Sequence, residues 1–128
     1  MYFKRQEAFR YAFEESIPAV CNVYKQANGF KEKVQSFQAY ILDLSPNGMK
    51  AASKTNIELR DDYILIFSFQ LSGTLIHFTG QMIRKRNAGA SFEYGIQSDG
   101  SDALKEQIIS ALKTYTKEQL KKQRNQGR

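Results

Sequence analysis

The sequence of 128 residues contains only one cysteine and one histidine, and each low count excludes a class of protein or of site. A single cysteine, Cys21, excludes a framework of internal disulfides. The single histidine, His77, has no companion for a metal site or for a histidine-dependent nucleophile. We therefore expect Cys21 to be a buried, inert thiol and His77 to be a partly exposed residue of a strand.

Long apolar runs are also missing from the chain. No run approaches the roughly 20 residues that a helix needs to cross a bilayer. Residues 1–5 lack the apolar core of a signal peptide. We therefore expect a cytoplasmic protein without membrane insertion, formed by one domain that is large enough to bury a core without disulfides or metal.

The net charge of +6 is concentrated at the C-terminus. Residues 113–128 contain six basic side chains and one acidic side chain, which gives +5, whereas residues 1–112 carry only +1. A nucleic-acid-binding β-barrel would interleave cations and aromatic residues on a strand face, but the cations here gather at the two termini. We therefore expect no nucleic-acid partner. The basic tail beyond Leu120 is expected to fray, either as a solvated end or as a contact for an acidic partner.

Alternating and clustered β-forming residues predict about six short strands. The expected strands cover residues 8–25 with a break near Pro18, and then residues 34–44, 49–53, 63–69, 75–85 and 90–96. Hairpin signals lie at residues 26–29 and 71–74, with a solvated connector expected at 31–33 and a loop at 54–62. The near-continuous apolarity of residues 63–69 predicts a strand that is covered on both faces, by the core and by a C-terminal helix.

Alternation also predicts which strand residues face the core. We expect Ile76, Phe78 and Met82 to share one face of their strand, and Ala90, Phe92, Tyr94 and Ile96 to face inward. After residues 98–102, which are rich in helix-capping types, apolar residues recur at helical spacing. They are Leu104, Ile108, Ala111, Leu112 and Tyr115. The pattern predicts an all-β fold with a C-terminal helix: a small six-stranded antiparallel β-barrel closed by one α-helix.

Two polar side chains at alternate positions lead into a tight turn at residues 43–48. In an extended chain Asp43 and Ser45 share one face, while Leu42 and Leu44 point the other way. The following Pro-Asn-Gly sequence is typical of a β-turn, in which Gly48 adopts whatever conformation the exit needs. The pair could bind a ligand or only the backbone of its own turn.

A second polar stretch, residues 4–10, contains the cations Lys4, Arg5 and Arg10 just ahead of the first expected strand. Together the two stretches resemble the PilZ family, which carries an Arg-x-x-x-Arg segment followed some thirty residues later by Asp/Asn-x-Ser-x-x-Gly. The second motif is matched in full at residues 43–48. The first is matched only at its closing arginine, because Gln6 occupies the opening position and Arg5 lies one place away.

The resemblance implies binding of the bacterial second messenger cyclic di-GMP, often as an intercalated dimer. It divides the chain into a mobile arginine arm at residues 1–10, a PilZ-like barrel at 11–97, and a helix with a basic tail at 98–128. The implied ligand contacts are Arg5, Gln6, Arg10, Asp43, Ser45 and Gly48, with Lys4 and Arg84 as additional candidates.

The resemblance implies a receptor that changes its arm or surface on binding and signals through an unknown partner protein, since no residue pattern suits chemistry on the ligand. The departure at Gln6 supports an alternative, in which a degenerate PilZ-like domain has lost the ligand and serves only as a protein–protein interaction module. An enzyme and a nucleic-acid-binding barrel fit the sequence less well than either.

Overall fold

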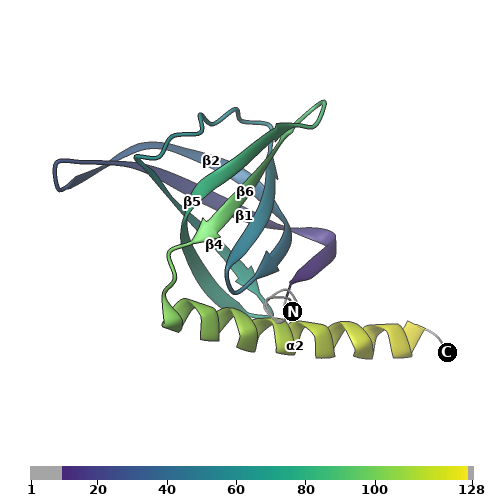
Figure 1. Cartoon of the computed structure of the whole chain (residues 1–128). Helices are drawn as coiled ribbons and strands as arrows, with labels where there is room; N and C mark the ends of the chain where they lie inside the picture. The colour runs from purple at the N-terminus through teal and green to yellow at the C-terminus, as the bar shows by residue number, and fades with distance from the viewer. Residues whose placement is uncertain (1–9, 127–128) are drawn as a thin grey trace, which may run out of the picture.

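The computed structural model describes residues 10–126, which form six strands and one helix (Figure 1). The strands are β1 (Tyr11–Ala27), β2 (Phe30–Ser45), β3 (Gly48–Ser53), β4 (Tyr63–Leu71), β5 (Thr74–Asn87) and β6 (Phe92–Ser98). They pair antiparallel in the closed order β1-β2-β3-β6-β5-β4, because β1 bonds to both β2 and β4. The helix α2 (Asp102–Gln126) follows β6 and lies across one end of the barrel. The predicted fold class is confirmed.

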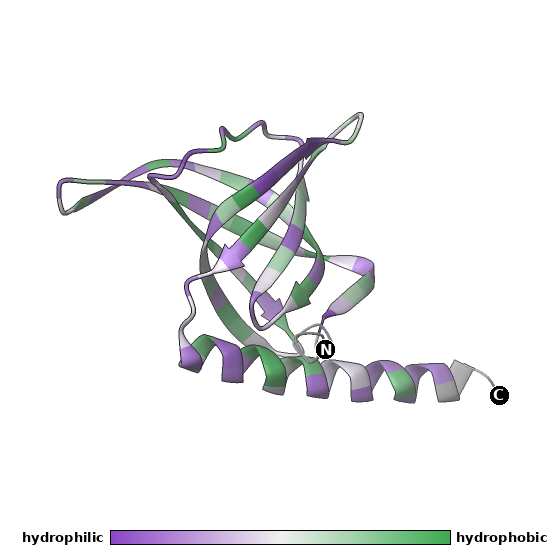
Figure 2. Ribbon diagram, viewed as in Figure 1, coloured by the Kyte–Doolittle hydropathy of each residue, from purple (hydrophilic) through white to green (hydrophobic). Residues whose placement is uncertain are grey.

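Strand alternation builds the core as expected. Hydrophobic and hydrophilic residues alternate along the strands in Figure 2, and the inward side chains of all six strands are buried together. Cys21 is among them, and burial raises the pKa of its thiol, as expected of an inert cysteine. His77 lies exposed on β5, with Nδ1 at 2.8 Å from the hydroxyl of Ser68, and this prediction is also confirmed.

Two hairpins form where the sequence indicated them. Asn28 and Gly29, with φ of 54° and 80°, join β1 to β2, and Ser72 and Gly73, with φ of 51° and 79°, join β4 to β5. Positive φ at both central residues matches the right-handed twist of the flanking strands. The β1–β2 hairpin extends well beyond the barrel wall (Figure 1).

Residues 31–33 belong to β2 and are not a connector. They pair with residues 24–26 of β1, but their side chains are exposed, so the sequence pattern did not reveal the strand. The break expected near residues 16–18 does not end the strand, since β1 is continuous, but the pairing of β1 with β2 is interrupted at residues 13–16, between Ala12 and Ile17. Pairing with β4 begins at Val20, so Pro18 needs no donor on that side.

The expectation that β4 is covered on both faces is wrong. Leu65, Phe67 and Phe69 are buried, whereas Ile64 and Ile66, which alternate with them, are only half-buried. The helix packs against β4 and β5 at the end of the barrel and does not cover the outer face of β4. The prediction of Ala90 as an inward strand residue is wrong as well, because β6 begins at Phe92 and Ala90 is exposed.

The helix begins at its predicted cap. The hydroxyl of Ser101 accepts the backbone N–H of Leu104 at 3.3 Å, as an N-cap does. The expected apolar stripe faces the barrel, and the hydroxyl of Ser72 in the β4–β5 turn donates to Glu118 at 2.9 Å. The helix continues to Gln126, so the expectation that the helix ends near Leu120 and frays from there is wrong for residues 121–126. Within residues 10–126 no helix is long and apolar enough to cross a membrane.

Candidate functional site

A groove of about 550 Å³ lies on the outside of the barrel, where the β2–β3 turn meets β5 and β6. Five residues that the sequence singled out line it together: Arg10, Asp43, Ser45, Gly48 and Arg84. They come from the residue just before β1, from the end of β2 with its turn into β3, and from β5. The other three candidates, Lys4, Arg5 and Gln6, lie outside the described residues. The fold thus brings the two polar stretches of the sequence to one surface.

The carboxylate of Asp43 is the point where the two stretches meet. Its Oδ1 atom forms an ion pair with the guanidinium of Arg10 and accepts the backbone N–H of Lys50 at 3.1 Å. The side chain of Asp43 is 14% exposed and that of Arg10 is 38% exposed. Within the described part of the chain no hydrogen bond ends on Oδ2 of Asp43. This oxygen therefore offers an acceptor to a ligand in the groove.

Ser45 stabilises the turn that carries the motif. Its hydroxyl accepts the backbone N–H of Gly48 at 3.1 Å and donates to the Gly48 carbonyl at 3.2 Å. The residue is buried. Ser45 therefore bonds the backbone of its own turn, which is one of the two roles that the sequence left open. One lone pair of the hydroxyl has no partner in this arrangement, since a hydroxyl offers one donor and two acceptor positions.

Gly48 is required for a different reason than expected. Its φ is not positive, so the turn does not depend on glycine's conformational freedom. A Cβ at this position would lie 2.7 Å from the carbonyl oxygen of Ile96, and backbone cannot move aside as a flexible side chain can. The neighbouring carbonyl of Asn47 accepts the backbone N–H of Ser98 at 2.9 Å. The turn is thus held closely against β6.

A bulge sets the direction of the motif. The register between β2 and β3 shifts between Ile41 and Asp43, which places an additional residue, Leu42, in β2. Ile41 and Leu44 are consequently both fully buried although they are three residues apart, while Leu42 is half-buried. The expectation that Leu42 and Leu44 share one face is wrong for this reason.

Three aromatic rings fix the start of β1 beside the groove. The ring centroids of Tyr11, Phe13 and Tyr115 lie 5.1 to 5.5 Å apart, and all three pairs meet edge to face. Such pairs contribute about 0.5–1.5 kcal/mol each beyond their buried area. Because Arg10 immediately precedes Tyr11, the helix contributes to positioning the arginine that contacts Asp43.

Lys50 and Ile83 are among the residues of the groove that sequence reasoning missed. Lys50 is exposed on β3, where it pairs with Asp43 of β2. Ile83 is 49% exposed on β5, which is high for a large apolar side chain. Its position in the outward row of polar residues at 77, 79 and 81 was a signal, since an apolar residue there gains nothing from the core.

The groove offers hydrogen-bond acceptors, cations and an apolar wall, but no metal site. Among residues 10–126 no three His, Cys, Asp or Glu side chains come close enough to hold a metal ion. The arrangement suits a ligand that combines negative charge, planar apolar surface and hydrogen-bond donors.

Comparisons with known proteins agree with the motifs and the fold. A model of the PilZ domain family matches residues 4–114. Among solved structures, the PilZ domain with c-di-GMP of YcgR from Escherichia coli matches with a TM-score of 0.55 and 21% sequence identity, over 87% of this chain and 94% of that chain. Identity this low supports the shared fold alone. The comparison with curated proteins found no match.

Proposed function

The chain belongs to the PilZ domain family, and from this premise we propose that it is a receptor for cyclic di-GMP. The observation that carries the proposal is the ion pair between Arg10 and Asp43 at an open groove. It joins the arginine stretch to the Asp-x-Ser-x-x-Gly turn, two segments that are 33 residues apart in the sequence. The solved relative from Escherichia coli is described with the same ligand.

The groove residues complement the chemical groups of the ligand. A guanine base carries N–H donors, which the Oδ2 atom of Asp43 can accept, and O6 and N7 acceptors, which an arginine can bind with two hydrogen bonds. The exposed side chain of Ile83 offers an apolar contact to a planar base. Arginine and lysine side chains pair with the phosphates.

The proposed action is binding without chemistry on the ligand. Ligand binding orders the arm of residues 1–10 against the barrel of residues 11–97, and the changed surface is read by a partner protein. The helix and basic tail at residues 98–128 complete the fold. This mode of action is that of a cytoplasmic receptor and not of an enzyme.

A second candidate function rests on Gln6. A neutral amide replaces the charge and the fork of donors that an arginine would bring to the opening position of the arm motif. In this second reading the domain binds no cyclic di-GMP and acts only as a protein–protein interaction module.

Calorimetric titration separates the two functions. The receptor should release or absorb heat with cyclic di-GMP, but not with GMP or a short oligonucleotide at equal concentration. Absence of binding to cyclic di-GMP at ligand concentrations up to the millimolar range would reject the receptor and leave the interaction module.

A further inference from the structure

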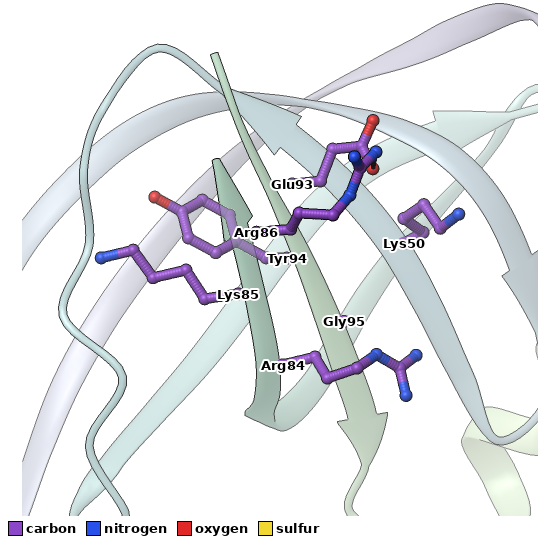
Figure 3. A pocket seen from close by; sticks show the side chains of 7 residues that line it. All are labelled: Lys50, Arg84, Lys85, Arg86, Glu93, Tyr94 and Gly95. Carbon is purple, nitrogen blue, oxygen red and sulfur yellow. Dashed lines mark hydrogen bonds and ion pairs between the residues drawn. The ribbon is translucent and has the colours of Figure 1, made fainter. Parts of the chain in front are cut away.

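A second depression of about 340 Å³ adjoins the groove on the outer face of β3, β6 and β5 (Figure 3). The two cavities share Lys50 and Arg84 in their walls. Nothing in the two sequence motifs assigns a role to this depression. Its position makes it a continuation of the groove away from the Asp43 turn.

Strand pairing places three residues of the depression in one row across the sheet. Gly95 of β6 pairs with Lys50 of β3 on one side and with Arg84 of β5 on the other. Neighbouring strands lie about 4.8 Å apart, so the backbones of Lys50 and Arg84 are separated by roughly 10 Å. Between them Gly95 presents only backbone. No side chain from β6 therefore separates the two cations.

Gly95 determines where Arg84 lies. A Cβ at position 95 would be 3.2 Å from Nη2 of Arg84 and 3.3 Å from its Nε. The guanidinium thus occupies the space that a side chain at position 95 would fill, and it extends towards the side on which Lys50 stands (Figure 3). A larger residue at this position would displace it.

The charges of Lys50 and Arg84 are not neutralised by other described residues. The one carboxylate in the wall, Glu93, is already paired with Arg86 at 2.7 Å. No carboxylate among the described residues forms an ion pair with Lys50 or Arg84. Two cations with no side chain of β6 between them form an attractive site for an anion of the size of a phosphate.

We propose that Lys50 and Arg84 bind a phosphate of the cyclic dinucleotide between their side chains, and that this site supplies from the barrel wall the charge that Gln6 fails to supply from the arm. The inference rests on the proposed function. Lys50 and Arg84 are then ligand-binding residues, and Gly95 is a positioning residue that acts through Arg84.

Affinity measurements on matched variants test the assignment. Lys50→Ala and Arg84→Ala should each weaken cyclic di-GMP binding about tenfold, the effect of one lost charge-assisted hydrogen bond. Each should also reduce the dependence of affinity on salt. Lys33→Ala is the control, because Lys33 is exposed in the β1–β2 hairpin and lines neither the groove nor the depression. It should bind as wild type does.

A double-mutant cycle tests the role of Gly95. Gly95→Val should weaken binding about tenfold, but it should have no further effect in an Arg84→Ala background if it acts by displacing that arginine. Thermal unfolding checks that each variant folds. If Gly95→Val does not fold, the two cation variants decide the question.

The outcomes separate the inference from the proposed function. Wild-type affinity in both Lys50→Ala and Arg84→Ala, together with loss of affinity in Asp43→Ala, would overturn the inference and leave the receptor intact. Absence of binding by the wild-type protein would overturn both. Equal losses in Lys50→Ala, Arg84→Ala and the control Lys33→Ala would show a general effect of charge and would also overturn the phosphate site.

Discussion

At the scale of single residues, Asp43 concentrates the interactions of the proposed site. Its Oδ1 atom forms the ion pair with Arg10 and also accepts the backbone N–H of Lys50 in β3. We expect Asp43→Ala to weaken cyclic di-GMP binding by about 1–3 kcal/mol, because a guanine donor would be left without its acceptor. Isothermal calorimetry measures the change.

Asn is the informative control at this position. Asp43→Asn keeps an acceptor oxygen but loses the charge, so it should bind more tightly than Asp43→Ala and more weakly than wild type. Unchanged affinity in both variants would place the ligand elsewhere on the molecule.

Tyr94 is a second residue whose role follows from its contacts. Its fully buried ring carries a hydroxyl that accepts the N–H of Ile57 at 2.8 Å and donates to the carbonyl of Thr55. This pair of bonds holds the 54–62 loop on the barrel. Tyr94→Phe should destabilise the fold by about 1–3 kcal/mol, because the buried N–H of Ile57 loses its partner. Urea unfolding gives the value.

Burial also raises the pKa of Tyr94. The phenol proton is then lost more easily from the unfolded chain than from the folded one. This contribution to stability is complete below the unfolded pKa of about 10 and is lost as the pH rises above it. Stability should therefore fall less steeply above pH 10 in Tyr94→Phe than in wild type. Parallel pH profiles for the two proteins would refute this coupling.

At the scale of elements, α2 connects the core to the start of β1. Tyr115 packs on Tyr11 and Phe13, whereas Leu120, about one turn further on, is 59% exposed. Tyr115→Ala should lower the thermal midpoint and speed amide exchange at residues 11–13, since two ring contacts are removed. Leu120→Ala is the matched control on the same helix. An equal loss of stability in both variants would contradict a specific role for the ring cluster.

Local sequence signals predicted the elements that depend on local chemistry. Asn28-Gly29 and Ser72-Gly73 gave the hairpins, alternation gave the inward faces of the strands, and helical spacing gave the stripe of α2. The strand at residues 31–33 was missed because its side chains are exposed, so that only backbone pairing with β1 reveals it. The bulge at Leu42 was missed for the same reason, as register is a property of two strands.

The site also has features that the sequence predicts and features that depend on contacts between strands. The motifs identified Asp43, Ser45 and Arg10, and the fold brings them together on one groove. The reason for Gly48 depends on the approach of β6, and the row formed by Lys50 and Arg84 depends on pairing across three strands. Neither of these contacts between strands can be predicted from the spacing of residues along the chain.

At the scale of the whole molecule, we propose that the charge of the arm and the charge of the barrel wall act on one ligand. Gln6 and Arg10 are four residues apart and would face the same side of an extended arm, whereas Arg5 would face the other. We expect Gln6→Arg to strengthen cyclic di-GMP binding by about 1–3 kcal/mol or to increase the number of ligands bound. Calorimetry reports both quantities.

The Arg5→Ala variant tests the alternative that Arg5, and not residue 6, fills the opening position of the arm motif. If Gln6→Arg leaves affinity and stoichiometry unchanged while Arg5→Ala abolishes binding, then Arg5 already fills the role through a bend of one residue in the arm. The prediction for Gln6→Arg would then be wrong, although the receptor would stand.

The central claim is that cyclic di-GMP binds in the groove where Arg10 meets Asp43. The most direct test is to map the backbone amide resonances of the protein during a titration with cyclic di-GMP. The account predicts saturable shifts at Gly48, Lys50 and Gln97, with Gly29 at the distant hairpin tip unchanged. Saturable binding that leaves the groove amides unshifted and moves those of the hairpin or the helix would contradict it.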